Sequence, residues 1–155
     1  MFDSDQFFMQ EAIKQAMIAA ENDEVPVGAV ITHQNKIIAK AYNQVELLKD
    51  PTAHAEMIAI TQASHSLSSK WLYDCCLYVT LEPCSMCAGA MVLARLQRIY
   101  FGATDPKAGA CGSIMNIVQH ERLNHRIDIQ KGIAEELCGE LLSNFFKRQR
   151  SLGKK

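Results

Sequence analysis

Two short segments of the sequence combine side chains that could bind and activate a metal ion. His54-Ala55-Glu56 is followed 27 residues later by Pro83-Cys84-Ser85-Met86-Cys87, which supplies one imidazole, one carboxylate and two thiols. Imidazole and thiolate are favoured zinc ligands. Cys84 and Cys87 are three residues apart, so at the start of a helix both sulfur atoms share one face, where the helix dipole favours thiolates. The spacing predicts one Zn²⁺ per chain, bound by His54, Cys84 and Cys87.

Glu56 is the carboxylate of this set that need not bind the metal. Three protein ligands leave tetrahedral zinc with one open position, as in catalytic rather than structural sites, and a water bound there becomes a nucleophile near neutral pH. Glu56 lies two residues from His54, so we expect both at a helix entrance, where the first turn aims them at one cavity. Glu56 is the predicted proton carrier: it takes the water's proton, protonates the ring nitrogen beside the attacked carbon and later protonates the leaving amine.

Two other interpretations of the cysteines stay open. A closed structural zinc site would need a fourth ligand, and a redox Cys-x-x-Cys pair would need no histidine. The apolar sequence around the remaining cysteines is typical of buried core thiols. The candidates for a fourth ligand are Cys75, Cys76, Cys111, Cys138 and His65.

The elements that position these residues alternate between helix and strand. Hydrophobic periodicity and turn residues predict helices at 6–20, from 56 to 62 and beyond, 84–95, 113–119 and 133–150, and strands at 27–32, 36–42, 77–81, 98–103 and 126–129. This order predicts an α/β fold: a three-layer α/β/α sandwich around a five-stranded mixed sheet, with an antiparallel hairpin turning at 33–35 and helical crossovers. Both ligand segments fall where a strand or loop enters a helix.

Length and composition limit the remaining possibilities. The chain has 155 residues, which suits one domain, and we expect that domain to span 1–155. Its first residues are acidic, which argues against a signal peptide, and no apolar run approaches the ~18 residues of a membrane span. We therefore expect a cytoplasmic protein.

The charge is uneven along the chain. The overall net charge of −1 combines 11 basic and 17 acidic side chains before residue 144 with five basic side chains and no acid in the tail 144–155. A basic end on an acidic body predicts an anionic partner, and an exposed, solvated terminus is the alternative. The five basic residues are Lys147, Arg148, Arg150, Lys154 and Lys155.

The sequence as a whole resembles the tRNA-specific adenosine deaminases, from about residue 6 to 150. The H-x-E and P-C-x-x-C motifs are shared by the zinc-dependent nucleobase deaminases in general. The Asn124-His125-Arg126 segment and the Phe145-Phe146 pair before the basic tail narrow the resemblance to the tRNA enzymes. The matching segments are 25–30, 50–56, 77–91, 101–105, 107–110, 124–126 and 141–146.

The resemblance implies a cytidine-deaminase-like fold and hydrolytic deamination of adenosine to inosine at the wobble position (34) of a tRNA anticodon, chiefly of an arginine tRNA. It also implies a homodimer, with RNA rather than DNA as natural substrate. Zinc would be held by His54, Cys84 and Cys87, with Glu56 as proton carrier. The implied substrate-binding residues are Asn43 at the base, Asp105 at a ribose, Phe145 and Phe146 near the loop, and Lys107, Asn124, Arg126, Lys147, Arg148 and Arg150 at the RNA.

Each of these assignments has a structural alternative. Asn43 could cap a turn, Asp105 could form a turn with Pro106, the two phenylalanines could anchor the last helix to the core, and Lys107 and Arg126 could be solvated surface. Two other functions remain possible. A deaminase of free guanine or cytidine would share the zinc motif but need no basic tail, and a non-catalytic RNA-binding subunit would be expected to lose Glu56. An anticodon loop offers the unpaired bases that a deaminase needs.

Overall fold

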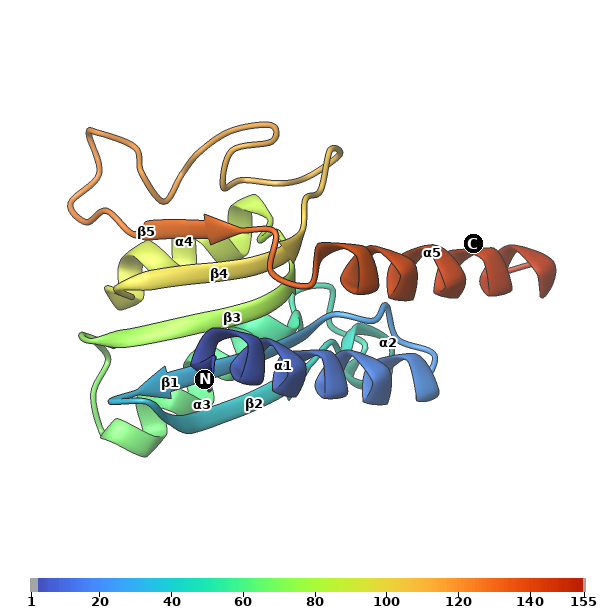
Figure 1. Ribbon diagram of the computed structural model, residues 1–155, viewed down its shortest axis with the longest axis horizontal. Coiled ribbons are helices and arrows are strands. Elements are labelled where there is room, and N and C mark those ends of the chain that lie inside the picture. The colour runs from blue at the N-terminus through green and yellow to red at the C-terminus, as the bar shows by residue number, and fades with distance from the viewer. Residues whose placement is uncertain (1–2, 155) are drawn as a thin grey trace.

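A mixed five-stranded sheet forms the middle layer of the structure, a computed structural model that describes residues 3–154 (Figure 1). Strands β1 (Gly28–His33), β2 (Lys36–Tyr42), β3 (Cys75–Leu81), β4 (Arg98–Ala103) and β5 (Asp128–Lys131) lie in the order β2-β1-β3-β4-β5. β1 is antiparallel to β2 and β3, whereas β3, β4 and β5 run parallel. The sheet is open, and the predicted α/β fold class is confirmed.

Helices cover both faces of the sheet. α1 (Ser4–Glu21) and α5 (Glu135–Ser151) lie on one face, and α3 (Ala55–Leu67) and α4 (Ser85–Ala94) lie on the other (Figure 1). Successive side chains along a strand point to opposite faces of the sheet, so the strands contribute to two hydrophobic cores. Val30 packs with α1, while its neighbour Ile31 packs with α3 and α4. No helix within residues 3–154 is long and apolar enough to cross a membrane.

Local sequence explains where several elements begin and turn. The Asp3 carboxylate caps α1 by accepting from the amides of Asp5 and Gln6 at 3.1 and 3.3 Å. Gln34 and Asn35 join β1 to β2 with φ values of 53° and 60°, the left-handed geometry of a tight hairpin turn. The predicted hairpin is therefore present, with β1 beginning one residue later than expected.

The predicted helix at 113–119 is wrong. This stretch forms turns and one isolated β-bridge, between Cys111 and Asn116. Gly112 has a φ of +135°, and the Ser113 amide donates to the Glu82 carboxylate rather than to a carbonyl one turn back. The crossover from β4 to β5 is consequently a long loop and not a helix.

Other boundaries differ from the predictions by one or two residues, and for β5 and α5 the cause is visible. β5 begins at Asp128 rather than 126, because the Ile127 amide is bonded to the Val118 carbonyl of the loop. β3 begins two residues earlier than predicted, at Cys75. α5 begins at Glu135 rather than 133, because Ala134 adopts a left-handed φ of 55°. A one-turn helix, α2 (Val45–Leu48), was not predicted.

Gly28 tests the packing of α1 on the sheet. A Cβ at this position would overlap the Ala12 carbonyl oxygen and lie 2.5 Å from the Ala16 amide nitrogen. Gly28→Ala should therefore lower the free energy of unfolding by at least about 1–3 kcal/mol, as overpacking does, measured by chemical denaturation. Gly139→Ala in α5 is the matched control, because a Cβ there meets no atom within 4 Å. It should raise stability by about 0.5–1 kcal/mol, and equal effects at the two glycines would contradict this packing.

Candidate functional site

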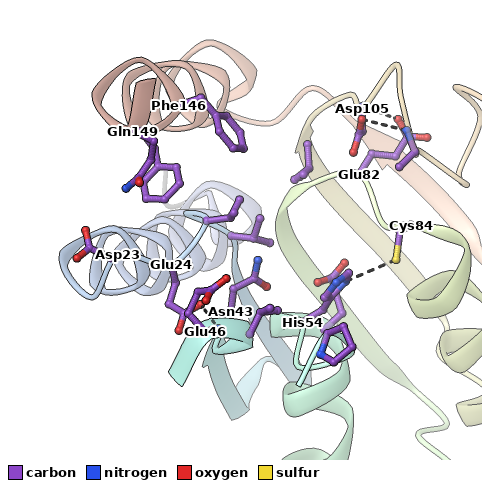
Figure 2. Close-up of a pocket in the computed structure, with 18 of the residues that line it drawn as sticks. Asp23, Glu24, Asn43, Glu46, His54, Glu82, Cys84, Asp105, Phe146 and Gln149 are labelled. Carbon is purple, nitrogen blue, oxygen red and sulfur yellow. Dashed lines mark hydrogen bonds between the residues drawn. The ribbon is translucent and has the colours of Figure 1, made fainter. Parts of the chain in front are cut away.

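The three predicted metal ligands meet at the carboxyl end of β3. His54 is the N-cap residue of α3 and Cys84 is the N-cap residue of α4, and Cys87 follows in the first turn of α4. The His54 Nδ1 atom lies 3.6 Å from Cys84 Sγ and 3.5 Å from Cys87 Sγ, and the three ligand atoms all lie within 4.8 Å of one another. Figure 2 shows His54 and Cys84 directed toward each other from their two segments. The helix entrances thus converge as the sequence predicts.

This spacing fits a tetrahedral metal ion. Zn–N and Zn–S bonds of about 2.0 and 2.3 Å at a tetrahedral angle separate the nitrogen and sulfur atoms by about 3.6 Å. The observed His54–Cys84 and His54–Cys87 separations of 3.6 and 3.5 Å match that value. The donor set of one imidazole and two thiols is typical of zinc, so the residues present fit the metal.

One of the two thiols, Cys84, is arranged to ionise. Hydrogen bonds to Cys87 and to His54 outweigh burial and lower the pKa of Cys84 to about 4. The hydrogen bond with Cys84, followed by burial, raises the pKa of Cys87, while the contact with Cys84 raises the pKa of His54. Cys84 therefore carries a thiolate at neutral pH, which attracts a cation to the site.

A fourth protein ligand is absent from the group. Within residues 3–154, the metal-binding cluster consists of His54, Cys84 and Cys87 alone. The other thiols lie outside this group, and burial raises the pKa values of Cys75 to about 11 and of Cys111 and Cys138 to about 12. Burial also raises the pKa of Cys76. These cysteines behave as core thiols, and the geometry favours a site with an open coordination position.

Glu56 lies beside the ligands in the first turn of α3, outside the metal-binding cluster. Its side chain is buried, with a relative exposure of 4%. Burial is the main reason that its pKa rises to about 7. A carboxyl group with a pKa near the working pH can both accept and return a proton, as the predicted role requires.

A cavity of about 730 Å³ opens above this group. Its volume lies within the ~300–1,000 Å³ of ligand pockets and is large enough for a nucleotide with part of its neighbours. The walls come from the α1–β1 connection, the segment from Asn43 to α2, the segments around Glu82 and Asp105, and α5 (Figure 2). His54, Glu56 and Cys84 line the same cavity, so a bound ring could reach all three.

Asn43 faces this cavity with a fixed amide. Its Oδ1 atom accepts a hydrogen bond from the Ala55 amide at 2.7 Å, and the side chain is only 8% exposed. The residue therefore caps the start of α3, whereas the structural alternative was that it caps a turn. Because the oxygen is engaged, the Nδ2 group is left as the donor available to a ligand in the cavity.

Asp105 also combines a turn with a place in the cavity wall. Its Oδ1 atom accepts from the amides of Lys107 and Ala108 at 3.0 and 3.1 Å, which forms the expected turn around Pro106. The residue is half-buried and lines the cavity, whereas the Lys107 side chain is exposed and does not line it. Both interpretations of Asp105 are thus compatible with its position.

α5 closes one side of the cavity. Phe145 is buried and Phe146 is 43% exposed, and both line the cavity with their rings 5.4 Å apart. Phe145 therefore anchors α5 and faces the cavity at once.

The basic residues after Phe146 divide into two groups. Arg148 donates to the Ala20 carbonyl at 3.2 Å and lies 4.0 Å from the Asp23 carboxylate, which Lys154 also approaches to 4.0 Å. Lys147 and Arg150 are exposed. α5 continues to Ser151, so this part of the chain is helical, and its basic side chains are exposed, as the alternative of a solvated terminus expects. Lys155 lies outside the described residues.

Asn124 and Arg126 are not brought to the cavity. Both are exposed in the loop that precedes β5. Arg126 donates to the Glu121 carbonyl at 3.4 Å, and His125 between them contacts the Leu96 carbonyl at 2.6 Å, which fixes this loop to the end of α4. A role for Asn124 and Arg126 would require contact with a larger ligand than the cavity holds.

Two buried carboxylates in the cavity wall were missed by the sequence analysis. Glu24 is 2% exposed and accepts from the amides of Glu46 and Leu47, which starts α2. Glu82 is 2% exposed and accepts from the loop after β4. The available signal was an acidic residue directly after the apolar strand β3, where an exposed charge is unexpected.

Comparison with known proteins agrees with this geometry. The family model of MafB19-like deaminases matches residues 2–150. The chain is 49% identical over 146 residues to a tRNA-specific adenosine deaminase of Bacillus subtilis, covering 94% of this chain and 91% of that protein. A solved structure from a study of tRNA:A34 deaminases at the wobble position superposes with a TM-score of 0.85 at 43% identity, covering 88% of this chain and 99% of the other. A guanine deaminase of Bacillus subtilis is 39% identical with a TM-score of 0.61, covering 63% of each chain.

Metal analysis tests the ligand set. The purified chain should hold one zinc ion, and Cys87→Ala should lose it because two ligands bind far more weakly than three. Cys111→Ala is the control, since this thiol is also buried but lies outside the ligand group. Of the two variants, only Cys111→Ala should keep its full zinc content in elemental analysis after dialysis. Equal metal content in the two variants would contradict the assignment.

Proposed function

The chain belongs to the tRNA-specific adenosine deaminases, within the MafB19-like deaminase family, and from this we propose that it converts adenosine to inosine at the wobble position (34) of a tRNA anticodon with the help of a zinc ion. The observation that carries the proposal is the group of His54, Cys84 and Cys87 with buried Glu56 beside it, at the base of a nucleotide-sized cavity. We further propose an arginine tRNA as the main substrate, as the family resemblance implies.

The reaction follows from the positions of these side chains. Zinc bound by the three ligands would lower the pKa of a water in its open position and so supply a nucleophile. Glu56 takes the proton of the attacking water and gives it to the ring nitrogen N1 as the water oxygen bonds to C6 of the base. Glu56 then takes the remaining proton from the new C6 hydroxyl group and passes it to the amine, so that the C6–N bond breaks, the C6 carbonyl forms and ammonia leaves. Asn43 donates from Nδ2 to an acceptor of the base and holds its plane against the ligands.

The cavity walls support an unpaired nucleotide as substrate. A base cannot reach Glu56 while it is stacked, so the target has to be turned out of an anticodon loop. Phe146 offers a partly exposed ring to such a loop, and Lys147 and Arg150 lie exposed on the same helix for its phosphates. Asp105 at the cavity wall would accept from a ribose 2′-hydroxyl, which DNA lacks.

We propose that the chain is a single deaminase domain that acts as a homodimer in the cytoplasm. Large apolar side chains stay exposed on α4 and the loop that packs against it, as expected for a surface that a second copy covers: Leu93, Ile114, Met115 and Leu123, with exposures of 76%, 54%, 46% and 43%. All six cysteines are free thiols, in keeping with a reducing compartment.

Mass spectrometry of the RNA tests the proposed reaction. The purified zinc-loaded protein is incubated with an unmodified anticodon stem-loop of an arginine tRNA bearing adenosine at position 34. Inosine should appear at that position and at no other adenosine. Free adenosine, cytidine and guanine are the matched substrates, and faster turnover of any of these would instead favour a free-base or nucleoside deaminase.

Glu56→Gln separates proton transfer from metal binding. The amide keeps the size of the side chain but cannot carry the proton, so the rate on the stem-loop should fall by at least ~10²–10⁴-fold. Zinc content and thermal stability should stay near those of the unchanged protein, because Glu56 lies outside the ligand group. Loss of zinc in this variant would mean that Glu56 is a ligand, and near-normal turnover would refute its role as proton carrier.

Substitution of Lys147 and Arg150 tests whether α5 contacts RNA phosphates. Each phosphate contact on a single strand contributes about −0.7 to the slope of log affinity against log salt. The double variant Lys147→Gln/Arg150→Gln should therefore bind the stem-loop more weakly, with a slope that is shallower by up to about 1.4. Lys36→Gln/Lys70→Gln removes two exposed charges at the opposite end of the sheet and should leave affinity and slope unchanged. Equal slopes in both double variants would remove α5 from the RNA interface.

A further inference from the structure

Glu82 is a buried carboxylate that takes no part in the mechanism above. It follows the last residue of β3 and precedes Pro83 and the ligand Cys84. Its backbone is fixed, because the Glu82 amide donates to the Ala103 carbonyl at 2.9 Å. The Glu82 side chain is only 2% exposed, and a buried charge requires compensating hydrogen bonds. The residues that donate these hydrogen bonds are therefore the part of the chain that Glu82 fixes in place.

All the partners of the carboxylate come from the loop after β4. Oε1 accepts from the Asp105 amide at 3.0 Å and the Ser113 hydroxyl at 2.5 Å, and Oε2 accepts from the amides of Cys111 and Ser113 at 3.0 and 3.1 Å. A carboxylate has about four acceptor directions, so these contacts satisfy it. They also outweigh the effect of burial and keep the pKa of Glu82 below its ordinary value.

The loop is built closely around this charge. A Cβ on Gly109 would overlap the Glu82 carboxylate, so any other residue there would have to displace that carboxylate. The Ala110 amide donates to the Pro83 carbonyl at 2.8 Å, which adds a backbone contact beside the carboxylate. Segment 105–113 is thereby attached to the same stretch of chain that presents Cys84.

Asp105 connects this arrangement to the cavity. Its amide is held by Glu82, and its Oδ1 atom is occupied by the turn at Lys107 and Ala108. The carboxylate of Asp105 can therefore face the cavity only where Glu82 places its backbone. Figure 2 shows Glu82 and Asp105 joined in this way on the cavity wall opposite Asn43 and Glu24.

We propose that Glu82 is a positioning residue which, acting through Asp105, sets the preference of the site for a ribose over a deoxyribose nucleotide. This inference rests on the proposed function, since it assumes a nucleic-acid strand in the cavity. In this role Glu82 acts through the backbone of Asp105 and not on the substrate itself. It fixes the distance between the Asp105 carboxylate and the metal ligands. The 2′-hydroxyl of the target ribose can then donate to Asp105 while the base lies beside the water at the ligand group.

The test is a double-mutant cycle on the ratio of RNA to DNA turnover. The substrates are an anticodon stem-loop and the same sequence with deoxyribose at the target nucleotide. In Glu82→Gln, the side-chain NH₂ group is a donor that faces the backbone amides of the loop, which are also donors. The hydrogen bonds on that side are lost and segment 105–113 is displaced. The RNA-to-DNA ratio of kcat/KM should fall roughly ten- to hundredfold, the range for one lost hydrogen bond to a charged group, mostly through a higher KM for RNA. The same substitution added to Asp105→Ala should cause almost no further change in the ratio.

Two further variants keep the test interpretable if Glu82→Gln folds poorly. Ser113→Ala removes one hydrogen bond to Oε1 without adding a donor, and should lower the ratio in the same direction by a smaller factor. Glu24→Gln is the matched control: it also alters a buried carboxylate that holds two backbone amides, but on the opposite wall. Any effect of Glu24→Gln on the ratio should be the same with and without Asp105→Ala.

The outcomes separate this inference from the proposed function. If the unchanged protein does not deaminate the stem-loop, the proposed function fails first. If it does, and the ratio is unaffected by Glu82→Gln and by Ser113→Ala in zinc-loaded protein, Glu82 has only a structural role. Additive effects of Glu82→Gln and Asp105→Ala would also overturn the inference, because they would show that the two residues act separately.

Discussion

The structure depends on the convergence of two helix entrances at the carboxyl end of one buried strand. α3 and α4 both pack on the same face of the sheet, and their N-cap residues are His54 and Cys84. Ligand atoms only 3.5–3.6 Å apart tolerate little movement of either helix. The apolar core that α3 and α4 share with β1, β2, β3 and β4 is what holds this geometry. A similar packing of α1 on the other face fixes the β1–β2 hairpin, from which Asn43 reaches the site.

Buried polar side chains around the cavity share one physical task. Asn43, Glu24 and Glu82 each accept hydrogen bonds from backbone amides at the start of a helix or within a loop. A buried acceptor is stable only when such donors are present, so each side chain fixes the segment that satisfies it. Glu56 differs, because burial raises its pKa to about 7. The wall residues give the cavity its shape, whereas Glu56 can take up and release a proton near neutral pH, as the reaction requires.

The sequence predicted the chemical groups of the site better than it predicted the conformation of the loops. His54, Cys84 and Cys87 could be identified because few residue types bind zinc and their spacing is local. The helix at 113–119 could not be excluded in this way, since the Ser113 amide is bonded to Glu82, which follows β3 and is distant in sequence. The same holds for Arg148, whose partner carbonyl and carboxylate lie at the far end of α1. Local patterns indicate what a segment prefers, whereas these contacts are decided by residues distant in sequence.

The central claim is that a water activated at the ligand group replaces the amine of one unpaired adenosine. It is tested most directly by running the reaction with an anticodon stem-loop in water enriched in ¹⁸O and measuring the mass of the nucleotide at the wobble position. The account predicts that the inosine formed carries the heavy oxygen, with release of one ammonia per inosine, in zinc-loaded protein and not after the metal is removed. Inosine without the label, or equal turnover in the metal-free protein, would contradict it.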